Sequence, residues 1–181
     1  MDVSLSLLVI RFAAGMLLMG HGAQKLVGIG GGPGLQTWTA NVEKMGFRPA
    51  ALWGAASVAA EFIGGIALAI GFFTPLVAAL LVGQLFVAIA KVHWPKGLWV
   101  QGGGYEYPFL LAVIVAVVGL GGPGRYSVDA ALGWDLVSGV IFVPLAALAI
   151  IVNALMIRAT PAPAAPRREE RQPAEARRRA A

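Results

Sequence analysis

Cysteine is absent from this chain, and charged residues are scarce. Only 13% of the 181 residues are charged, against 58% that are hydrophobic, and the mean hydropathy is +0.76. Without cysteine the chain itself can form no disulfide, thiol relay, iron–sulfur cluster or covalently attached c-type haem. With so little charge it lacks the polar surface of a soluble domain. We therefore predict an integral membrane protein that crosses the bilayer several times.

Five apolar stretches are separated by glycine, proline and charged residues. A helix needs about 20 apolar residues to cross a hydrocarbon core of roughly 30 Å. The fourth stretch is short, and it spans only with little tilt or in a locally thinned bilayer. The predicted fold class is an all-α membrane protein, an antiparallel transmembrane helix bundle with a four-helix core in residues 1–135 and an additional helix at 136–157. The stretches cover residues 5–27, 50–73, 74–92, 107–121 and 138–157.

The basic residues are distributed unevenly. Seven of the 14 follow residue 157, where Pro, Ala and Arg dominate, so residues 158–181 are predicted to be a disordered basic tail. With five spans, 12 of the 14 lie on one side, which predicts an outside N-terminus and a cytoplasmic C-terminus. The tail is expected to contact anionic lipids of the inner leaflet. We expect no nucleic acid partner, because Glu169, Glu170 and Glu175 dilute the positive charge.

Two charged residues lie within predicted spans, Arg11 in the first and Glu61 in the second. Charges in hydrocarbon normally face the bundle interior and pair. Counted from the predicted outer ends of the two helices, their depths differ by about 5–8 Å at 1.5 Å per residue. We therefore predict an intramembrane ion pair between Arg11 and Glu61, with Gln84 joining the polar core by hydrogen bonding. A catalytic or proton-handling role for Glu61 stays open.

A second polar group is predicted near the inner surface, where the first helix and the third loop converge. Simpler explanations cover part of it, since lysines extend to the interface and tyrosines form aromatic belts. A quinone headgroup needs hydrogen-bonding groups at the end of an apolar slot, and this group would supply them. The candidate substrate-binding or quinone-binding residues are His21, Gln24, Lys25, His93, Tyr105 and Glu106.

Haem and metal are the other chemistries that this group suggests. Haem would need His21 and His93 as axial ligands, but their predicted depths differ by about two helical turns, which disfavours it. A metal set of His21, His93, Glu61 and Glu106 has no diagnostic spacing, so no metal site is predicted. The cofactor stays open, with quinone the leading choice.

An ordered set of motifs supports a family assignment. Arg11 is followed by Gly20-His21-Gly22-x-Gln24-Lys25, later by Gly103-Gly104-Tyr105-Glu106-Tyr107-Pro108, and then by Gly122-Pro123-Gly124-Arg125-Tyr126-Ser127-x-Asp129. Over about residues 5–132 the chain closely resembles the DoxX family of bacterial membrane proteins. The resemblance implies a small bundle, usually of four spans, in the plasma membrane. The fifth apolar stretch and the basic tail depart from that pattern.

The resemblance also implies a direction for function. Members of the family have been linked to quinone-coupled oxidation of thiosulfate, to quinone or catechol detoxification, and to membrane complexes that support oxidative-stress enzymes. We therefore expect a membrane subunit or accessory protein of a redox system that binds a quinone and has a soluble or membrane redox partner. The alternatives are a non-catalytic scaffold that recruits a soluble enzyme, and a small-solute transporter. Whether the chain is itself an enzyme stays open.

Overall fold

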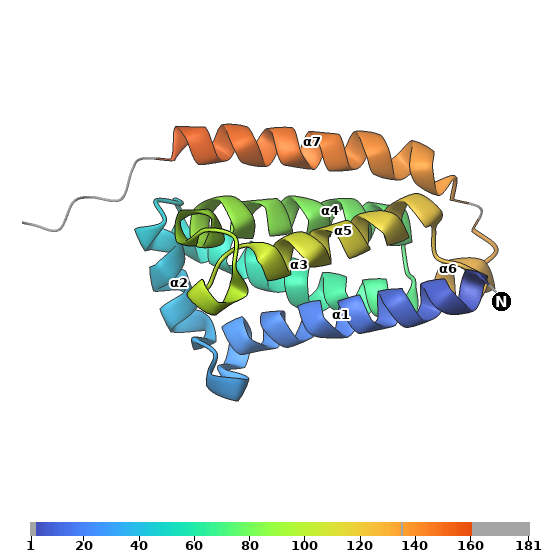
Figure 1. Ribbon diagram of the computed structural model, residues 1–181, viewed down its shortest axis with the longest axis horizontal. Coiled ribbons are helices and arrows are strands. Elements are labelled where there is room, and N and C mark those ends of the chain that lie inside the picture. The colour runs from blue at the N-terminus through green and yellow to red at the C-terminus, as the bar shows by residue number, and fades with distance from the viewer. Residues whose placement is uncertain (1–2, 135, 161–181) are drawn as a thin grey trace, which may run out of the picture.

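The computed structural model describes residues 3–134 and 136–160. These residues form helices and connecting turns, and no strand occurs among them (Figure 1). The predicted all-α fold class is therefore confirmed. The predicted tail begins inside the last helix, at Arg158, and its part from residue 161 onward lies outside the described residues.

Long antiparallel helices make up the bundle. Within residues 3–134 and 136–160, four stretches are long and apolar enough to cross a membrane: α1, α3, α7, and α4 with its continuation to Lys96. Helix α5 has only 16 residues, about 24 Å at 1.5 Å per residue, so the predicted fourth span is shorter than the others. The chain is a multi-pass membrane protein, with four candidate spans in its described part. The helices are α1 (Val3–Val27), α3 (Ala50–Ile70), α4 (Thr74–Ala88), α5 (Glu106–Gly121) and α7 (Ser138–Ala159) (Figure 1).

The two ends of the bundle differ. At one end, the α2 end, helix α2 (Gly34–Lys44) runs across the bundle axis, near the turns that join α4 to α5 (Figure 1). At the opposite end, the α6 end, the start of α1 meets the short helix α6 (Val128–Ala131). Helix α2 lies outside the five predicted spans, because its sequence is too polar to form an apolar stretch.

Asp129 fixes the turn between α3 and α4 at the α6 end. Its carboxylate is fully buried and accepts hydrogen bonds from the backbone N–H of Phe73 at 2.7 Å, and from the N–H and hydroxyl of Thr74 at 2.9 and 2.8 Å. These donors would otherwise be unpaired at the start of α4. The turn itself needs Gly71 and Phe73 in left-handed conformations, with φ of 69° and 47°. A distant segment therefore supplies the cap that this tight connection requires.

Glycines bring α1 and α3 into close contact. A Cβ atom on Gly15 would lie 2.5 Å from the carbonyl oxygen of Gly65, and one on Gly22 would lie 2.5 Å from the backbone nitrogen of Phe62. Such distances leave no room for a larger side chain, so the two backbones pack directly. This contact sets the stagger of α1 against α3.

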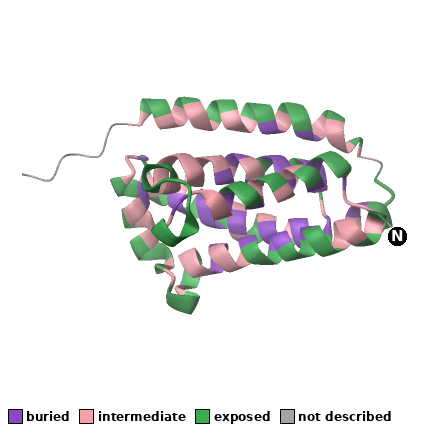
Figure 2. Cartoon of the chain, in the orientation of Figure 1, coloured by how far each residue is buried: buried purple, intermediate pink, exposed green. Residues whose placement is uncertain are grey.

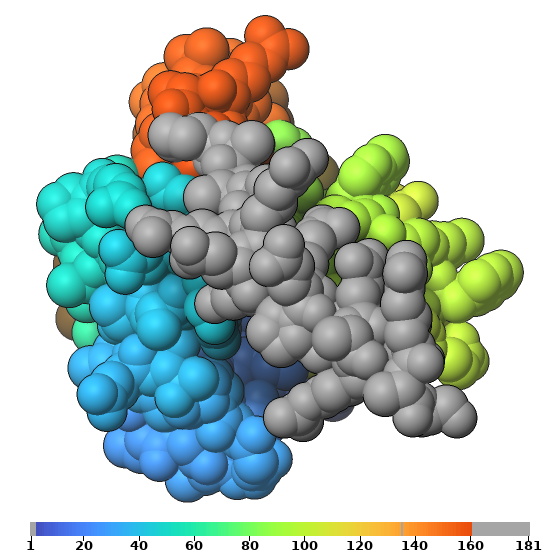
Figure 3. Space-filling view, turned by 90° about the vertical axis from the view of Figure 1, so that its left-hand side faces the viewer, coloured from blue at the N-terminus to red at the C-terminus, as the bar shows by residue number. Residues whose placement is uncertain are grey.

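The exterior of the bundle is apolar. Buried residues line the inner faces of the helices, and exposed ones lie on the outer faces (Figure 2). Val9, Phe109 and Leu148 are each more than half exposed, which is costly in water but suits contact with lipid. Helix α7 lies at the margin of the bundle, as the end-on view shows (Figure 3), and only Phe142 and Ala146 of its side chains are buried. The fold therefore matches association with a lipid bilayer.

Candidate functional site

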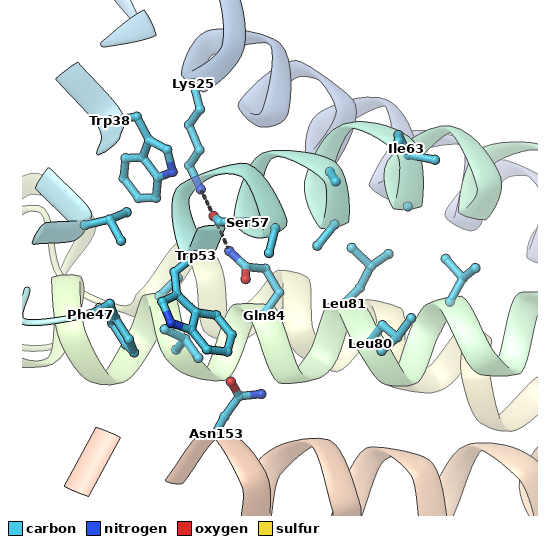
Figure 4. Close-up of a pocket in the computed structure, with 18 of the residues that line it drawn as sticks. Lys25, Trp38, Phe47, Trp53, Ser57, Ile63, Leu80, Leu81, Gln84 and Asn153 are labelled. Atoms are coloured by element: carbon cyan, nitrogen blue, oxygen red, sulfur yellow. Dashed lines mark hydrogen bonds between the residues drawn. The ribbon is translucent and has the colours of Figure 1, made fainter. Parts of the chain in front are cut away.

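A buried polar cluster joins α1, α3 and α4 toward the α2 end. The Lys25 ammonium lies 2.5 Å from Oε1 of Glu61 and 3.4 Å from Oγ of Ser57. Nε2 of Gln84 donates to the same two residues, at 2.8 Å to Ser57 and 3.2 Å to Glu61. Ser57 and Glu61 are four residues apart and so lie on one face of α3. One acid, one base, one hydroxyl and one amide thus form a single hydrogen-bonded network. Figure 4 shows the two contacts of Ser57, with Lys25 and with Gln84.

The cluster is electrostatically balanced but only partly satisfied. The side chains of Lys25 and Glu61 are 15% and 5% exposed, so each charge depends on the other. The ammonium also lies 4.2 Å from the centre of the Trp38 ring, a cation–π contact. Among the described residues, Oε2 of Glu61 and Nε1 of Trp38 are buried without a hydrogen-bond partner. The cluster therefore has one acceptor and one donor that are free to bind a further group.

The structure gives Arg11 and Glu61 partners other than those predicted. Nη2 of Arg11 donates to the carbonyl oxygen of Tyr126, and its guanidinium faces the charge of Asp129. Arg11 lies against Gly71, which directly follows α3 and is ten residues after Glu61, so the two sites are about 15 Å apart along the helix axis. The sequence predicts similar depths for Arg11 and Glu61 because it assumes that α1 and α3 end at the same level. In the structure α1 extends past the end of α3. Glu61 pairs with Lys25 instead, and Gln84 joins that pair as predicted for the polar core.

An apolar groove begins at this cluster. Its volume is about 540 Å³, and its walls come mainly from α3 and α4, with Asn153 and Met156 of α7 at one side. Along α3 it extends from Trp53 to Ala67, about 21 Å at 1.5 Å per residue. Lys25, Ser57 and Gln84 lie at the α2 end of the groove together with Trp38 and Trp53 (Figure 4). Asn153 faces these side chains from α7 (Figure 4), and the remainder of the lining is apolar. The groove thus has a polar, aromatic head and a long apolar body.

The other predicted binding residues are distributed over separate contacts. A ring nitrogen of His21 lies 3.2 Å from the hydroxyl of Tyr107, and Nδ1 of His93 lies 2.8 Å from the carbonyl oxygen of Gly103. Tyr105 stacks on Trp94, with ring centres 5.0 Å apart, and Glu106 accepts from the N–H of Val100 at 3.0 Å. Gln24 packs against the glycine-rich turn after α1. In the described part of the chain, no three His, Asp or Glu side chains gather as a metal site would require.

Four residues of the groove head are not among the residues predicted from the sequence: Trp38, Trp53, Ser57 and Asn153. Two signals were available: Ser57 lies one turn before Glu61 on the same helix face, and Asn153 is a lone amide in an otherwise apolar stretch. The aromatic residues carried no such signal, because tryptophans near a membrane interface are common.

One of the comparisons with known proteins finds a match. The model of the DoxX family matches residues 6–94, a stretch that contains Lys25, Ser57, Glu61 and Gln84 but not Asn153. No curated protein and no solved structure matches the chain significantly. The three helices that supply the polar cluster thus lie within the matched stretch, and this chain belongs to the DoxX family.

Proposed function

We propose that this protein binds a prenylated quinone, in one or other redox state, and acts as a membrane subunit or accessory protein of a redox system. The observation that carries the proposal is the junction of a polar, aromatic cluster with a long apolar groove. A prenylated quinone has the same two parts, a planar polar ring and an extended apolar tail. The family membership of the chain supports the same direction.

The groove head would hold the ring. The Lys25 ammonium has three N–H donors, and Glu61 and Ser57 are its two nearby oxygen partners. A quinone carbonyl accepts hydrogen bonds, so Lys25 is the donor that suits it. The indoles of Trp38 and Trp53 line the same space and offer flat surfaces to a planar ring.

The groove body would hold the tail. Its lining includes Ile63, Leu80 and Leu81, and Phe72 and Phe73 lie at its α6 end. Burial of apolar surface stabilises binding by roughly 25 cal/mol per Å². A tail that follows the groove would therefore contribute much of the affinity, while the cluster would set the position of the ring.

The test is binding of a decyl-tailed ubiquinone to the protein in nanodiscs. Binding is measured by the quenching of tryptophan fluorescence and by the amount of quinone retained. Ala60→Phe places a ring inside the groove and should abolish saturable binding. Ala55→Phe, on an exposed part of α3 that does not line the groove, is the matched control and should bind normally. Circular dichroism checks that both variants fold.

A second pair of variants locates the bound ring. Trp53→Phe should lose much of the quenching, whereas Trp99→Phe should not, because Trp53 lines the groove and Trp99 does not. Binding no greater than that of empty nanodiscs, or equal binding by the Ala60→Phe variant, would overturn the proposal.

A further inference from the structure

Gln84 presents an oxygen, not a nitrogen, to the groove. Its Nε2 donates to Oγ of Ser57 and to the Glu61 carboxylate. Because a carboxylate can only accept, the nitrogen must be the amide atom that faces Glu61. Oε1 therefore points the other way, on the side of Trp53 and Asn153 (Figure 4). Among the described residues, no donor reaches this oxygen within hydrogen-bond distance.

Asn153 presents a second oxygen by the same reasoning. Its Nδ2 donates at 2.8 Å to the carbonyl oxygen of Ala149, one turn earlier on α7. A carbonyl can only accept, so Oδ1 is the atom left for another partner. Gly83 permits this approach, because a Cβ atom there would lie 3.1 Å from Nδ2 of Asn153. Asn153 projects from α7 toward the groove head, from the side opposite α3 (Figure 4).

The groove head therefore offers one cationic donor and two amide acceptors. A quinone ring has carbonyl oxygens that only accept, so it suits Lys25 but leaves both amide oxygens without a donor. A quinol has two hydroxyl groups, each of which both donates and accepts. A quinol thus complements the whole head, and a site built to bind a hydroxyl discriminates strongly against an analogue that lacks it.

We propose that the groove selects the quinol over the quinone, and that Asn153 on α7 is a specificity-determining residue. This inference rests on the quinone site proposed above and assigns its preferred redox state. Leaving one acceptor unpaired in an apolar site weakens binding by about tenfold or more. Asn153 lies on α7, outside the stretch matched by the family model.

The experiment compares three probes with the same decyl tail: ubiquinol, ubiquinone and the ubiquinol dimethyl ether, which keeps the ring but has no O–H donor. Each is incubated without oxygen with immobilised nanodiscs that carry the full chain, and bound probe is quantified by chromatography after subtraction of empty nanodiscs. The wild type should bind the quinol about tenfold more tightly than either of the other probes. A monoacylglycerol with a decyl chain tests whether any hydroxyl headgroup is sufficient.

Variants connect the preference to its residues. Asn153→Leu should lower quinol affinity several-fold and leave quinone affinity unchanged, and Ser138→Ala, at the other end of α7, should change neither. Equal affinities for quinol and quinone, an unchanged preference in Asn153→Leu, or monoacylglycerol binding as tight as that of the quinol would each overturn the inference while leaving the quinone site in place. Binding of neither quinol nor quinone would instead overturn the proposed function.

Discussion

Lys25 and Glu61 form a charged pair inside a helix bundle whose outer surface is apolar. Their charges are stable there because each compensates the other and because Ser57 and Gln84 add hydrogen bonds. Removing one partner leaves the other charged and buried, which costs more than the pair itself contributes.

The first prediction concerns this pair. Glu61→Leu and Lys25→Met should each destabilise the protein by about 3–5 kcal/mol, because each leaves an uncompensated charge. The double variant should be less destabilised than the sum of the two, since it leaves no charge unpaired. Thermal unfolding in a mild detergent measures all three. Strictly additive losses would show that the two residues do not interact.

The partner of Glu61 illustrates what the sequence can and cannot predict about a site. That Glu61, Gln84 and Lys25 matter follows from their place in apolar stretches, because polar groups in a membrane are costly. Which of them meet depends on how far each helix is shifted along its neighbour. That shift comes from the close contacts of Gly15 and Gly22 with α3, and no hydropathy pattern records it.

At the scale of the helices, the close contact between α1 and α3 leaves no space for added volume. Gly15→Ala should lower the melting temperature, at a cost of about 1–3 kcal/mol, because the new methyl group meets the backbone of α3. Gly20→Ala is the matched control: it lies on the same helix, with nothing within 4 Å of the added Cβ atom. There the substitution should be neutral or slightly stabilising, since alanine favours helix more than glycine does. Similar losses in both variants would contradict the close-contact interpretation.

Helix α7 packs against α4, and Gly83 of α4 lies close to Ala149 of α7. We propose, as the sequence suggested, that residues 1–135 form the DoxX-like core and that α7 is an added helix. Gly83→Val should displace α7, because a Cβ atom at Gly83 already approaches Cβ of Ala149 to 2.9 Å. In an Ala149→Cys background, maleimide labelling should then rise while the core keeps its melting temperature. A large drop in melting temperature would mean that α7 belongs to the core.

The existence of the long helices was predictable, whereas their ends and α2 were not. Apolar stretches give the spans directly because the bilayer demands them. The cap of α4 comes from Asp129, more than 50 residues later in the chain, so nothing local to residues 73–74 predicts it. Helix α2 is polar enough to resemble a loop and is helical because it packs against α3 and α1.

For the whole molecule, the distribution of basic residues supports an orientation. In the described part of the chain, Lys44, Arg48 and Lys96 lie at the α2 end, whereas Arg125 lies at the α6 end. We propose that the α2 end faces the cytoplasm, by the bias of Lys and Arg toward inner loops.

Single introduced cysteines test this orientation. The chain has no cysteine of its own, so all labelling of the protein by a maleimide comes from the introduced residue. Ala131→Cys, an exposed position at the α6 end, should react with a membrane-impermeant maleimide on intact cells. Lys44→Cys, exposed on α2, should react only after the cells are opened. The reverse pattern would invert the proposed topology.

The groove also has an open side. Ile63 and Leu80, which line it, are 64% and 57% exposed on the outer surface of the bundle. In a bilayer that surface is hydrocarbon, so a ligand would enter sideways from the membrane and would never cross water. Occupancy would then follow the mole fraction of ligand among the lipids, in competition with acyl chains. Diluting the sample with buffer should leave occupancy unchanged, while adding lipid should lower it.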